Sequence, residues 1–572
     1  MSEVALALEP QVTGAALIFE LLAEAGVDTI FGYPGGAVLP LYDALVQQDR
    51  VRHVLVRHEQ AAVHAAQGYA RSTGKPGVVL VTSGPGATNT ITGLVDALMD
   101  SVPIVCLSGQ VARALIGTNA FQEANMLALS RAATKYNCMV HQPGQLAPLL
   151  RRALEVATSG RPGPVLVDIP KDIQAMSAPR TAFDRPLPPL SLPRIVPPAR
   201  ASLTAAAALI LAARRPILYS GSGVINAGAR ATVALRELAR RTGAPVTSTL
   251  MGLGAFPASH PQWLGMPGMH GTYEANLAMH GADLIMCIGA RFDDRVTGRL
   301  DGFAPSARKI HIDIDASEIG KLVPVDVGLN GDCGDVLEAL LETLGDRRSV
   351  DLAAWWRTIE GWRARDCLAY AQGPDTILPQ HAIRRLFALT RDHDPIVATE
   401  VGQHQMWTAQ HFGFDAPKRW LTSGGLGTMG YGLPAAIGAQ IAHPGRLVID
   451  IAGEASIQMN MQELATAVQH EAPVKLFILN TEYMGMVRQW QQRHHGGRYA
   501  HSYSSTLPDF VALAQAYGWT GLRVGDPADL DATIRTMIDT PGPVLVDCRV
   551  AKLENCYPMM PSGAAHDDIV LG

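Results

Sequence analysis

Two apolar segments that end in polar residues carry the clearest chemical signal. Leu447–Ile451 is a predicted strand that leads into Gly453-Glu454-Ala455-Ser456, and Val474–Leu479 is a second one that leads into Asn480-Thr481. A helix is predicted between them from apolar residues at helical spacing, namely Ile457, Met461, Leu464 and Val468. In a parallel sheet both strands end at one edge, where ligands of open α/β sheets bind. The oxygens of Glu454 and Thr481 would then lie side by side, as a hard cation that holds a diphosphate requires.

A second candidate is the acid in Arg57-His58-Glu59-Gln60, which precedes the small-residue stretch AAVHAAQGYAR. Small residues let a helix pack closely, so Glu59 would be partly shielded from water. Taken alone, a glutamate at a helix start is a surface residue stabilised by the helix dipole. Tyr33-Pro34-Gly35-Gly36 and the turn from Thr82 to Ala87 are glycine-rich and follow apolar strands. Such turns let backbone approach a ligand, although each one is also readily explained as a tight turn.

Composition limits the classes of protein that this chain can represent. Its 572 residues predict about two to four domains of roughly 150 residues each. A hydrophobic fraction of 48% and a charged fraction of 17% fit a large, well-buried enzyme, and a net charge of −5 gives no sign of a nucleic-acid or anionic-membrane partner. The seven cysteines have no metal-binding spacing, which favours a reducing compartment. With no basic leader or membrane-length apolar run, the expected location is cytoplasmic.

An internal repeat predicts two related domains. The heptapeptide PGPVLVD occurs at 162–168 and again at 541–547, and each copy reads as a strand that closes an α/β domain. Chance remains an alternative for so short a match. A proline-rich stretch at 178–199 reads as a linker. The middle segment has its own predicted strands: Pro216–Ser220, Pro245–Ser248, Asp283–Gly289 and Lys309–Asp313. Strands that alternate with Ala/Leu-rich helical stretches predict parallel sheets with right-handed crossovers.

These motifs together resemble thiamin-diphosphate (ThDP) dependent decarboxylases and carboligases, and most closely the catalytic subunits of acetohydroxyacid synthase (acetolactate synthase). The resemblance covers about residues 12–565 and includes FGYPGGAVLPLYDAL, TSGPGATN, GTNAFQE, GARFDDRVTG, GLGTMGYGLPAAIGA, MGMVRQWQQ and PMMPSGAAH. It implies an α/β fold of three Rossmann-like, doubly wound parallel-sheet domains. These are an N-terminal ThDP pyrimidine-binding domain (1–187), a central FAD-binding domain (195–345) and a C-terminal domain for the ThDP diphosphate and metal (375–550), with a tail at 551–572.

The resemblance implies a role for Glu59 and a set of cofactor ligands. In the family this carboxyl binds the pyrimidine ring of ThDP and favours its imino tautomer, so that the cofactor performs the hard chemistry. The implied ThDP-binding residues are Tyr33, Pro34, Glu59, Val401, Gly402, Gln403, His404, Gly427, Met429, Gly453, Glu454, Ala455, Ser456, Gly485 and Met486. The implied metal ligands are Glu454, Thr481 and the Tyr483 carbonyl. Gly425–Gly430 also fits GxGxxG, but the preceding residues are a poor strand, which disfavours a dinucleotide site.

The resemblance also implies a flavin that performs no net redox step. Its implied ligands are Arg161, Gly221, Ser222, Gly223, Thr249, Leu250, Met251, His270, Gly289, Arg291, Asp293, Arg295, Asp313, Ile314 and Asp332. A glycine turn after a strand can hold a pyrophosphate, and an acid at a strand end can bind a ribose. Read singly, each of these is a surface turn or a solvated carboxylate.

The implied reaction decarboxylates pyruvate and transfers the hydroxyethyl unit to a second pyruvate or to 2-ketobutyrate, the first common step of branched-chain amino acid biosynthesis. The implied substrate residues are Gly36, Phe121, Gln122, Lys171, Arg295 and Trp490. Arg295 suits paired hydrogen bonds to a carboxylate. The family implies a homodimer or tetramer and a separate regulatory small subunit. Another ThDP-dependent decarboxylase or carboligase, and a paralogue with an impaired metal site, are the alternatives.

This chain departs from the family pattern at two metal ligands. Glu454 stands where the family has Asp, and Thr481 stands where it has Asn. Glutamate extends the carboxylate by about one bond, ~1.5 Å, and threonine offers a hydroxyl in place of an amide carbonyl. The site could bind Mg²⁺ after a small backbone shift, prefer a more tolerant ion such as Mn²⁺ or Ca²⁺, or be impaired. We expect a working metal site.

Overall fold

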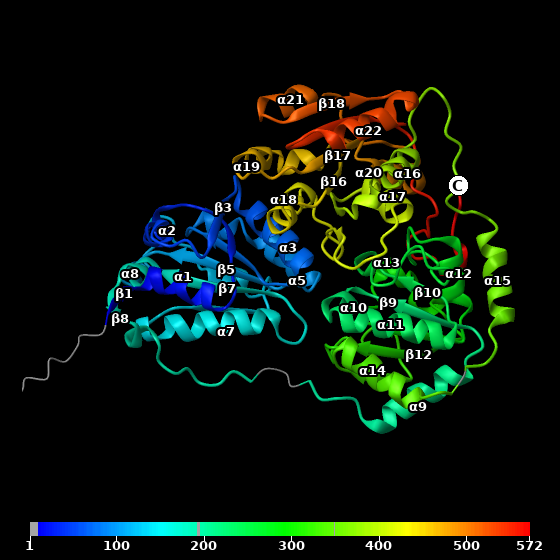
Figure 1. Cartoon of the computed structure of the whole chain (residues 1–572), viewed down its shortest axis with the longest axis horizontal. Helices are drawn as coiled ribbons and strands as arrows, with labels where there is room; N and C mark the ends of the chain where they lie inside the picture. The colour runs from blue at the N-terminus through cyan, green and yellow to red at the C-terminus, as the bar shows by residue number, and fades with distance from the viewer. Residues whose placement is uncertain (1–9, 192–194, 348) are drawn as a thin grey trace, which may run out of the picture. The chain divides into compact units, whose positions relative to one another are not determined.

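The computed structural model describes residues 10–191, 195–347 and 349–572, in two compact units. Residues 1–192, 423–445 and 459–474 form the first unit, and residues 193–422, 446–458 and 475–572 form the second (Figure 1). The start of the predicted N-terminal domain, residues 1–9, lies outside the described residues. The two units are described separately below.

The first unit is built on a six-stranded parallel sheet in the order β3-β2-β4-β5-β7-β6. Its strands are β2 (Thr29–Tyr33), β3 (Arg52–Leu55), β4 (Gly77–Val81), β5 (Ile104–Gln110), β6 (Tyr136–Met139) and β7 (Pro164–Pro170). β4, β5 and β7 are buried along their whole length, which explains their continuous apolar sequences. The main helices are α1 (Gly14–Glu24), α2 (Leu39–Val46), α3 (Glu59–Thr73), α5 (Ile91–Met99), α7 (Leu146–Thr158) and α18 (Gly432–Ala442).

Helices α3 and α18 pack backbone against backbone. A Cβ added at Gly438 would lie 1.8 Å from the Ala65 carbonyl oxygen, and one added at Gly68 would lie 2.0 Å from the Ala435 oxygen. No side chain fits at either position, so the small residues that the sequence places in both helices set this close approach. The packing connects the helix that begins at Glu59 to the helix that follows residues 423–431.

The second unit contains a five-stranded parallel sheet in the order β10-β9-β11-β12-β13. The strands are β9 (Pro216–Ser220), β10 (Val246–Ser248), β11 (Leu284–Ile288), β12 (Arg308–Asp313) and β13 (Val327–Asn330). Four of them lie where the sequence predicts strands. Helices α9 (Arg200–Ala212), α11 (Ala229–Thr242), α12 (Tyr273–Gly281) and α14 (Cys333–Leu344) belong to the same part of the unit, and their apolar faces enter the cores around this sheet.

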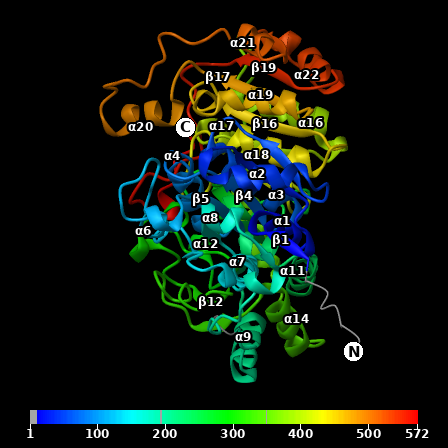
Figure 2. The same cartoon turned by 90° about the vertical axis from the view of Figure 1, so that its left-hand side faces the viewer.

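The second unit also contains a six-stranded parallel sheet in the order β15-β14-β16-β17-β19-β18. Figure 2 labels three of its strands, β16, β17 and β19. The strands are β14 (Ile396–Thr399), β15 (Trp420–Leu421), β16 (Val448–Gly453), β17 (Lys475–Asn480), β18 (Thr520–Val524) and β19 (Val544–Arg549). Its helices include α16 (Pro379–Thr390), α17 (Gln403–His411), α20 (Gly485–His494), α21 (Phe510–Ala516) and α22 (Leu530–Asp539). The three parallel sheets confirm the predicted fold class.

The repeated heptapeptide occupies equivalent places in the two six-stranded sheets. Numbered along the chain within each sheet, both sheets have the order 2-1-3-4-6-5, and the repeat forms the sixth strand, β7 in one and β19 in the other. An identical topology with the same sequence at the same strand supports a duplicated α/β unit over a chance match.

Two local predictions differ from the structure. The helix expected from Ile457 begins only at Leu464, as α19 (Leu464–Gln469), and two short 3₁₀ turns precede it. Asn460 interrupts the helix because its side chain donates a 2.6 Å hydrogen bond to the Gly430 carbonyl. The linker predicted at 178–199 also contributes to a core, because Phe183 near its start is fully buried in the first unit.

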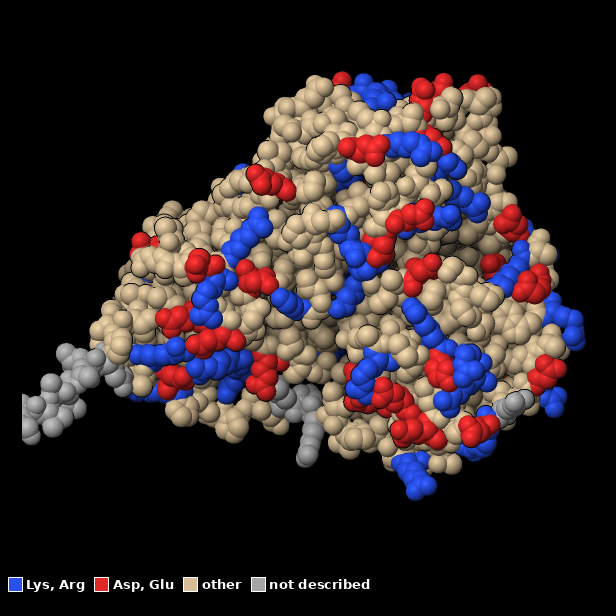
Figure 3. Space-filling view, in the orientation of Figure 1, with Lys and Arg blue, Asp and Glu red and all other residues tan. Residues whose placement is uncertain are grey.

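The distribution of surface charge agrees with the sequence analysis. Acidic and basic side chains alternate over the face that Figure 3 shows, as expected from the small net charge. Within the described ranges, no helix is long and apolar enough to cross a membrane. All seven cysteines are free thiols, and Cys106 and Cys287 are buried in strands.

Candidate active site

The three predicted metal ligands lie together at the ends of β16 and β17 in the second unit. Glu454 is only 1% exposed, and its Oε2 accepts a 3.1 Å hydrogen bond from the Thr481 backbone N–H. The Thr481 hydroxyl lies 3.0 Å from the Tyr483 carbonyl oxygen and 3.5 Å from Glu454 Oε2. Burial raises the pKa of Glu454 to about 7, against the opposing effect of the bonds from Thr481. A cation beside a buried carboxylate of this kind would favour its charged form.

This donor set suits a hard divalent cation. It consists of a carboxylate, a hydroxyl and a backbone carbonyl, all of them oxygen ligands of the kind that Mg²⁺, Mn²⁺ and Ca²⁺ take. In the part of the chain that the structure describes, no three His, Cys, Asp or Glu side chains cluster as a metal site. A site with one charged ligand is expected to rely on the phosphate oxygens of a cofactor for the rest of its charge.

Glycines around His404 and Gln403 bring three backbone segments together in the same unit. A Cβ at Gly402 or Gly453 would lie 2.7–2.8 Å from the His404 ring, and one at Gly485 would lie 2.0 Å from Gln403 Oε1. His404 is buried, its Nε2 has no hydrogen-bond partner among the described residues, and burial lowers its pKa to about 3. The arrangement is a cradle of backbone beside a neutral imidazole whose Nε2 has no partner among the described residues, which fits a polar cofactor. The remaining predicted residues, Val401, Ala455, Ser456 and Met486, belong to these same segments.

In the first unit, the predicted pyrimidine-site residues lie at the carboxyl edge of the six-stranded sheet. Glu59 is the first residue of α3, and its Oε2 accepts a 3.0 Å hydrogen bond from Asn89. Tyr33 ends β2 and Pro34 follows it. The next residue must be glycine, because a Cβ at Gly35 would lie 2.4 Å from Thr82. The two glycine-rich turns therefore touch each other, as expected for turns that line one ligand site.

A buried acidic pair holds the loop that carries Gly427 and Met429, and sequence reasoning missed it. Asp96 on α5 accepts hydrogen bonds from the hydroxyls of Ser423 and Thr428. Asp100 accepts the backbone N–H groups of Gly424 and Gly425 at 3.0 and 2.7 Å and pairs with Arg71 at 2.7 Å. The only available signal was two acids one turn apart within the apolar sequence ITGLVDALMD.

The predicted substrate residues fall on both units. Gly36, Phe121, Gln122 and Lys171 belong to the first, where Phe121 is 88% exposed and Lys171 opens α8 (Lys171–Ala175). Trp490 on α20 belongs to the second. With Met486, Val487 and His495 it lines a groove of about 600 Å³. Arg295 is exposed and lies 3.7 Å from Asp294, so its charged end is free to reorient.

Glycine turns and acidic strand ends of the five-stranded sheet form the predicted flavin region. A Cβ at Gly221 or Gly223 would lie 2.3 or 2.7 Å from backbone atoms of Gly289, whose φ is +56°. β9 and β11 therefore end in mutually contacting glycine turns, a geometry that admits a pyrophosphate. Thr249, Leu250 and Met251 follow β10 directly, and the Thr249 N–H donates to the Ser220 carbonyl at 2.9 Å.

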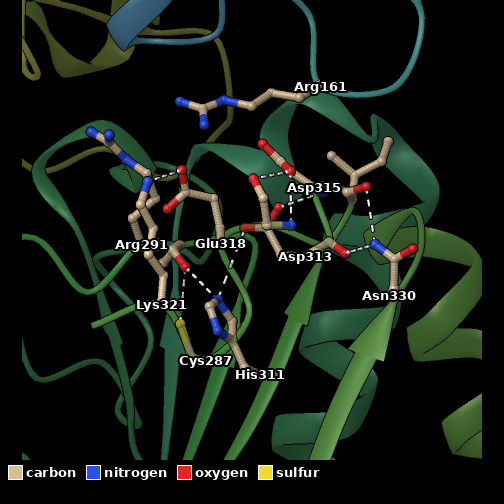
Figure 4. Close-up of polar contacts among 12 residues, drawn as sticks. Arg161, Cys287, Arg291, His311, Asp313, Asp315, Glu318, Lys321 and Asn330 are labelled. Carbon is tan, nitrogen blue, oxygen red and sulfur yellow. Dashed lines mark hydrogen bonds and ion pairs between the residues drawn. The ribbon is translucent and has the colours of Figure 1, made fainter. Parts of the chain in front are cut away.

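The acids of this region are held by backbone hydrogen bonds (Figure 4). Asp313 Oδ1 accepts the Asp315 N–H at 2.8 Å, and Asn330 donates to the carbonyls of Asp313 and Ile314. Asp332 and Asp293 are N-caps, of α14 and of α13 (Asp294–Thr297) respectively. These caps are a structural role that the sequence analysis did not assign.

The other predicted flavin ligands differ in their surroundings. His270 is buried, neither ring nitrogen has a hydrogen-bond partner among the described residues, and burial lowers its pKa to about 4. Arg291, also in the second unit, is half-buried beside Asp293. Arg161 is in the first unit and donates to Ser101 Oγ at 2.8 Å.

Three parallel sheets, with oxygen-bearing side chains at two strand ends and a carboxylate at the start of α3, belong here to a thiamin-diphosphate enzyme, as three family models show. Models of the thiamine pyrophosphate enzyme N-terminal TPP binding domain, central domain and C-terminal TPP binding domain match residues 12–129, 203–340 and 400–548.

Comparison with curated proteins narrows the class. The chain is 47% identical to the acetolactate synthase isozyme 3 large subunit of Escherichia coli and 45% identical to the acetolactate synthase large subunit of Haemophilus influenzae, over 98% of each chain. It is 45% identical to the mitochondrial acetolactate synthase catalytic subunit of Saccharomyces cerevisiae, over 98% of this chain and 83% of the yeast protein. The chain belongs to the acetolactate synthase large-subunit family.

Proposed function

We propose that this chain is a catalytic subunit that decarboxylates pyruvate and joins the resulting two-carbon unit to a second 2-ketoacid. Pyruvate as acceptor gives acetolactate, and 2-ketobutyrate gives acetohydroxybutyrate. The observation that carries the proposal is the meeting of Glu454, Thr481 and the Tyr483 carbonyl beside the His404 cradle. That arrangement supports a cation site formed by the two substituted ligands, on a chain that matches its relatives along nearly its full length.

Glu59 is proposed to control the proton of the cofactor. Bound ThDP supplies a carbon nucleophile and an electron sink for decarboxylation. Glu59 is fixed at the helix start by Asn89 and holds or releases a proton at its carboxyl, which a glutamine could not do. Gly427 and Met429 are proposed to contact the cofactor from the loop that Asp96 and Asp100 hold.

The proposed metal is Mg²⁺, with Mn²⁺ also accepted. Glu454, Thr481 and the Tyr483 carbonyl would hold it, together with the cofactor's diphosphate. The hydroxyl of Thr481 is a weaker donor than an amide carbonyl, so we expect a higher metal requirement than an Asp/Asn site would have. Ions that tolerate irregular coordination geometry should lose the least affinity from the replacement of Asp and Asn by Glu454 and Thr481.

FAD is proposed as a structural cofactor of the five-stranded domain. The glycine turns at Gly221–Gly223 and Gly289 suit its pyrophosphate, and Asp313 suits a ribose. The buried imidazole of His270 offers a further polar contact. No electron transfer is assigned to the flavin.

Arg295 and Trp490 are proposed to bind the acceptor. Arg295 has an exposed guanidinium that can make two hydrogen bonds to the carboxylate of the second ketoacid. Trp490 lines an open apolar groove that can receive the acceptor side chain. Gly36, Phe121, Gln122 and Lys171 are proposed to line the approach.

The proposed assembly is a homodimer or tetramer, with a separate regulatory small subunit as partner. The proposal of a small-subunit partner is supported by relatives that are named large or catalytic subunits. A cytoplasmic location is proposed from the seven free thiols.

The test is a product assay with the purified chain, ThDP and FAD. We expect acetolactate from pyruvate alone, and acetohydroxybutyrate when 2-ketobutyrate is added. Release of acetaldehyde without either product would instead indicate a simple decarboxylase. No pyruvate consumption at saturating Mg²⁺ or Mn²⁺ would overturn the proposal.

A further inference from the structure

The aspartate of the repeated PGPVLVD heptapeptide makes the same contact in both six-stranded sheets. Asp168 on β7 accepts a hydrogen bond from Gln110 Nε2 at 2.9 Å, and Asp547 on β19 accepts one from Asn480 Nδ2 at 2.8 Å. Gln110 ends β5 and Asn480 ends β17, the fourth strand of each sheet. Both aspartates are almost completely buried.

The strand register shows that the two contacts are equivalent. Asp168 pairs with Ser108 in the ladder of β5 and β7, and Asp547 pairs with Ile478 in the ladder of β17 and β19. In both sheets the amide side chain belongs to the residue two positions beyond that pair. Side chains two apart in a strand share a face, so the aspartate and the amide are brought together by the ladder itself.

Each amide group also uses its oxygen to fix the loop beyond the strand. Asn480 Oδ1 accepts the Glu482 N–H at 3.2 Å, and Gln110 Oε1 accepts the Val111 N–H at 2.9 Å. Glu482 has a φ of +60°, an unfavourable conformation for a residue with a side chain. The Asn480 bond supports that turn, and the turn brings the Tyr483 carbonyl within 3.0 Å of the Thr481 hydroxyl.

We propose that Asp547 is a positioning residue for the metal site and acts through Asn480 on the turn that presents Thr481 and Tyr483. The proposal rests on the proposed function, because it assumes a metal at Glu454, Thr481 and Tyr483. Asp547 holds the amide nitrogen of Asn480, so that the amide oxygen faces the Glu482 N–H. Without that restraint the side chain can rotate and the turn loses its support.

Asp168 provides a matched control within the same chain. It holds Gln110, whose Nε2 also donates to the Ala124 carbonyl at 2.9 Å, so it acts on the loop after Phe121 and Gln122 rather than on metal ligands. Removing either aspartate deletes a buried side chain at an equivalent strand position, with the difference that Asp547 also pairs with Arg523 at 3.0 Å while Asp168 accepts from the Ser108 hydroxyl. A general loss of stability should therefore appear in both variants, whereas weaker metal binding should appear in only one.

The experiment measures Mn²⁺ binding by the full chain in the presence of ThDP, from the electron paramagnetic resonance signal of free Mn²⁺. We expect Asp547→Ala to weaken binding about tenfold, the effect of losing one buried hydrogen bond to a charged group. Asp168→Ala should change it by less than about twofold, as expected for a distant site. Asp547→Asn should keep most of the affinity, because its amide oxygen can still accept the bond from Asn480.

A double-mutant cycle tests whether Asp547 acts through Asn480. Asn480→Ala should weaken Mn²⁺ binding as Asp547→Ala does, and the double variant should bind no more weakly than Asn480→Ala alone. Equal Mn²⁺ affinity in wild type and Asp547→Ala, equal losses in Asp547→Ala and Asp168→Ala, or additive losses in the cycle would overturn the proposal. Failure of the wild type to bind Mn²⁺ with ThDP would instead overturn the metal site itself.

Discussion

The close packing of α3 against α18 predicts that one added methyl group, in the variant Gly438→Ala, strongly reduces stability and activity. A Cβ at Gly438 would lie 1.8 Å from the Ala65 carbonyl oxygen, whereas real Cβ contacts are not shorter than 3.0 Å. In the variant Gly438→Ala, the helices must therefore separate by about 1.2 Å or more, and overpacking of this kind costs roughly 1–3 kcal/mol.

The same shift should also impair the chemistry. α3 begins at Glu59, and α18 directly follows the loop that carries Met429. A misplacement of about 1 Å in catalytic geometry can cost on the order of 100-fold in rate. We therefore expect Gly438→Ala to lower the calorimetric unfolding midpoint by several degrees and to reduce acetolactate formation at saturating ThDP by one to two orders of magnitude.

Gly445→Ala is the matched control, because a Cβ there would meet nothing within 4 Å. It lies in the same unit, three residues after the end of α18. We expect wild-type stability and activity for this variant. If Gly438→Ala behaved like Gly445→Ala, the packing argument would be refuted.

Three further predictions address the carboxylates and the metal. Glu59→Gln should retain ThDP binding, measured by fluorescence titration, but lose at least about 100-fold in pyruvate turnover; near-normal turnover would refute the assigned role. Thr481→Asn should lower the Mg²⁺ concentration for half-maximal activity severalfold, and an unchanged requirement would count against Thr481 as a ligand. Burial raises the pKa of Asp168 from 3.8 to about 7. Protonated Asp168 therefore contributes to the free energy of unfolding. This contribution is fully present below pH 3.8 and is lost as the pH rises towards 7, by a few kcal/mol at most. The melting temperature of the cofactor-free protein should therefore fall more between pH 5 and 8 in wild type than in Asp168→Asn, and parallel slopes would contradict this.

Much of the fold followed from local sequence patterns. Continuous apolar segments bounded by glycine turns identified β9 and β16 to within two residues, because a strand buried on both faces needs no alternation of polar residues. The repeat at 162–168 and 541–547 indicated a duplicated domain, and the shared strand order agrees with it. The predicted domain boundaries stay predictions.

The parts that sequence could not supply depend on contacts between distant residues. Nothing in the sequence around Asn460 shows that its side chain binds the Gly430 carbonyl and so prevents a helix from starting at Ile457. Asp96 and Asp100 belong to no recognisable motif, yet they hold a loop more than 300 positions away in the sequence. The roles of Asp168 and Asp547 required the register of two ladders.

For the predicted metal ligands, by contrast, the positions at strand ends followed from the sequence alone. The sequence did not reveal how the site would accommodate Glu454 in place of Asp and Thr481 in place of Asn. In the structure the Thr481 N–H donates to Glu454 Oε2, and the Thr481 hydroxyl lies 3.5 Å from the same oxygen.

The most direct test is acetolactate formation by the purified chain with ThDP, FAD and pyruvate over a series of Mg²⁺ and Mn²⁺ concentrations. A working site formed by Glu454, Thr481 and the Tyr483 carbonyl predicts metal-dependent acetolactate formation that saturates with both ions and half-saturates at a lower concentration of Mn²⁺. Absence of both ThDP binding and product at saturating metal would contradict the account.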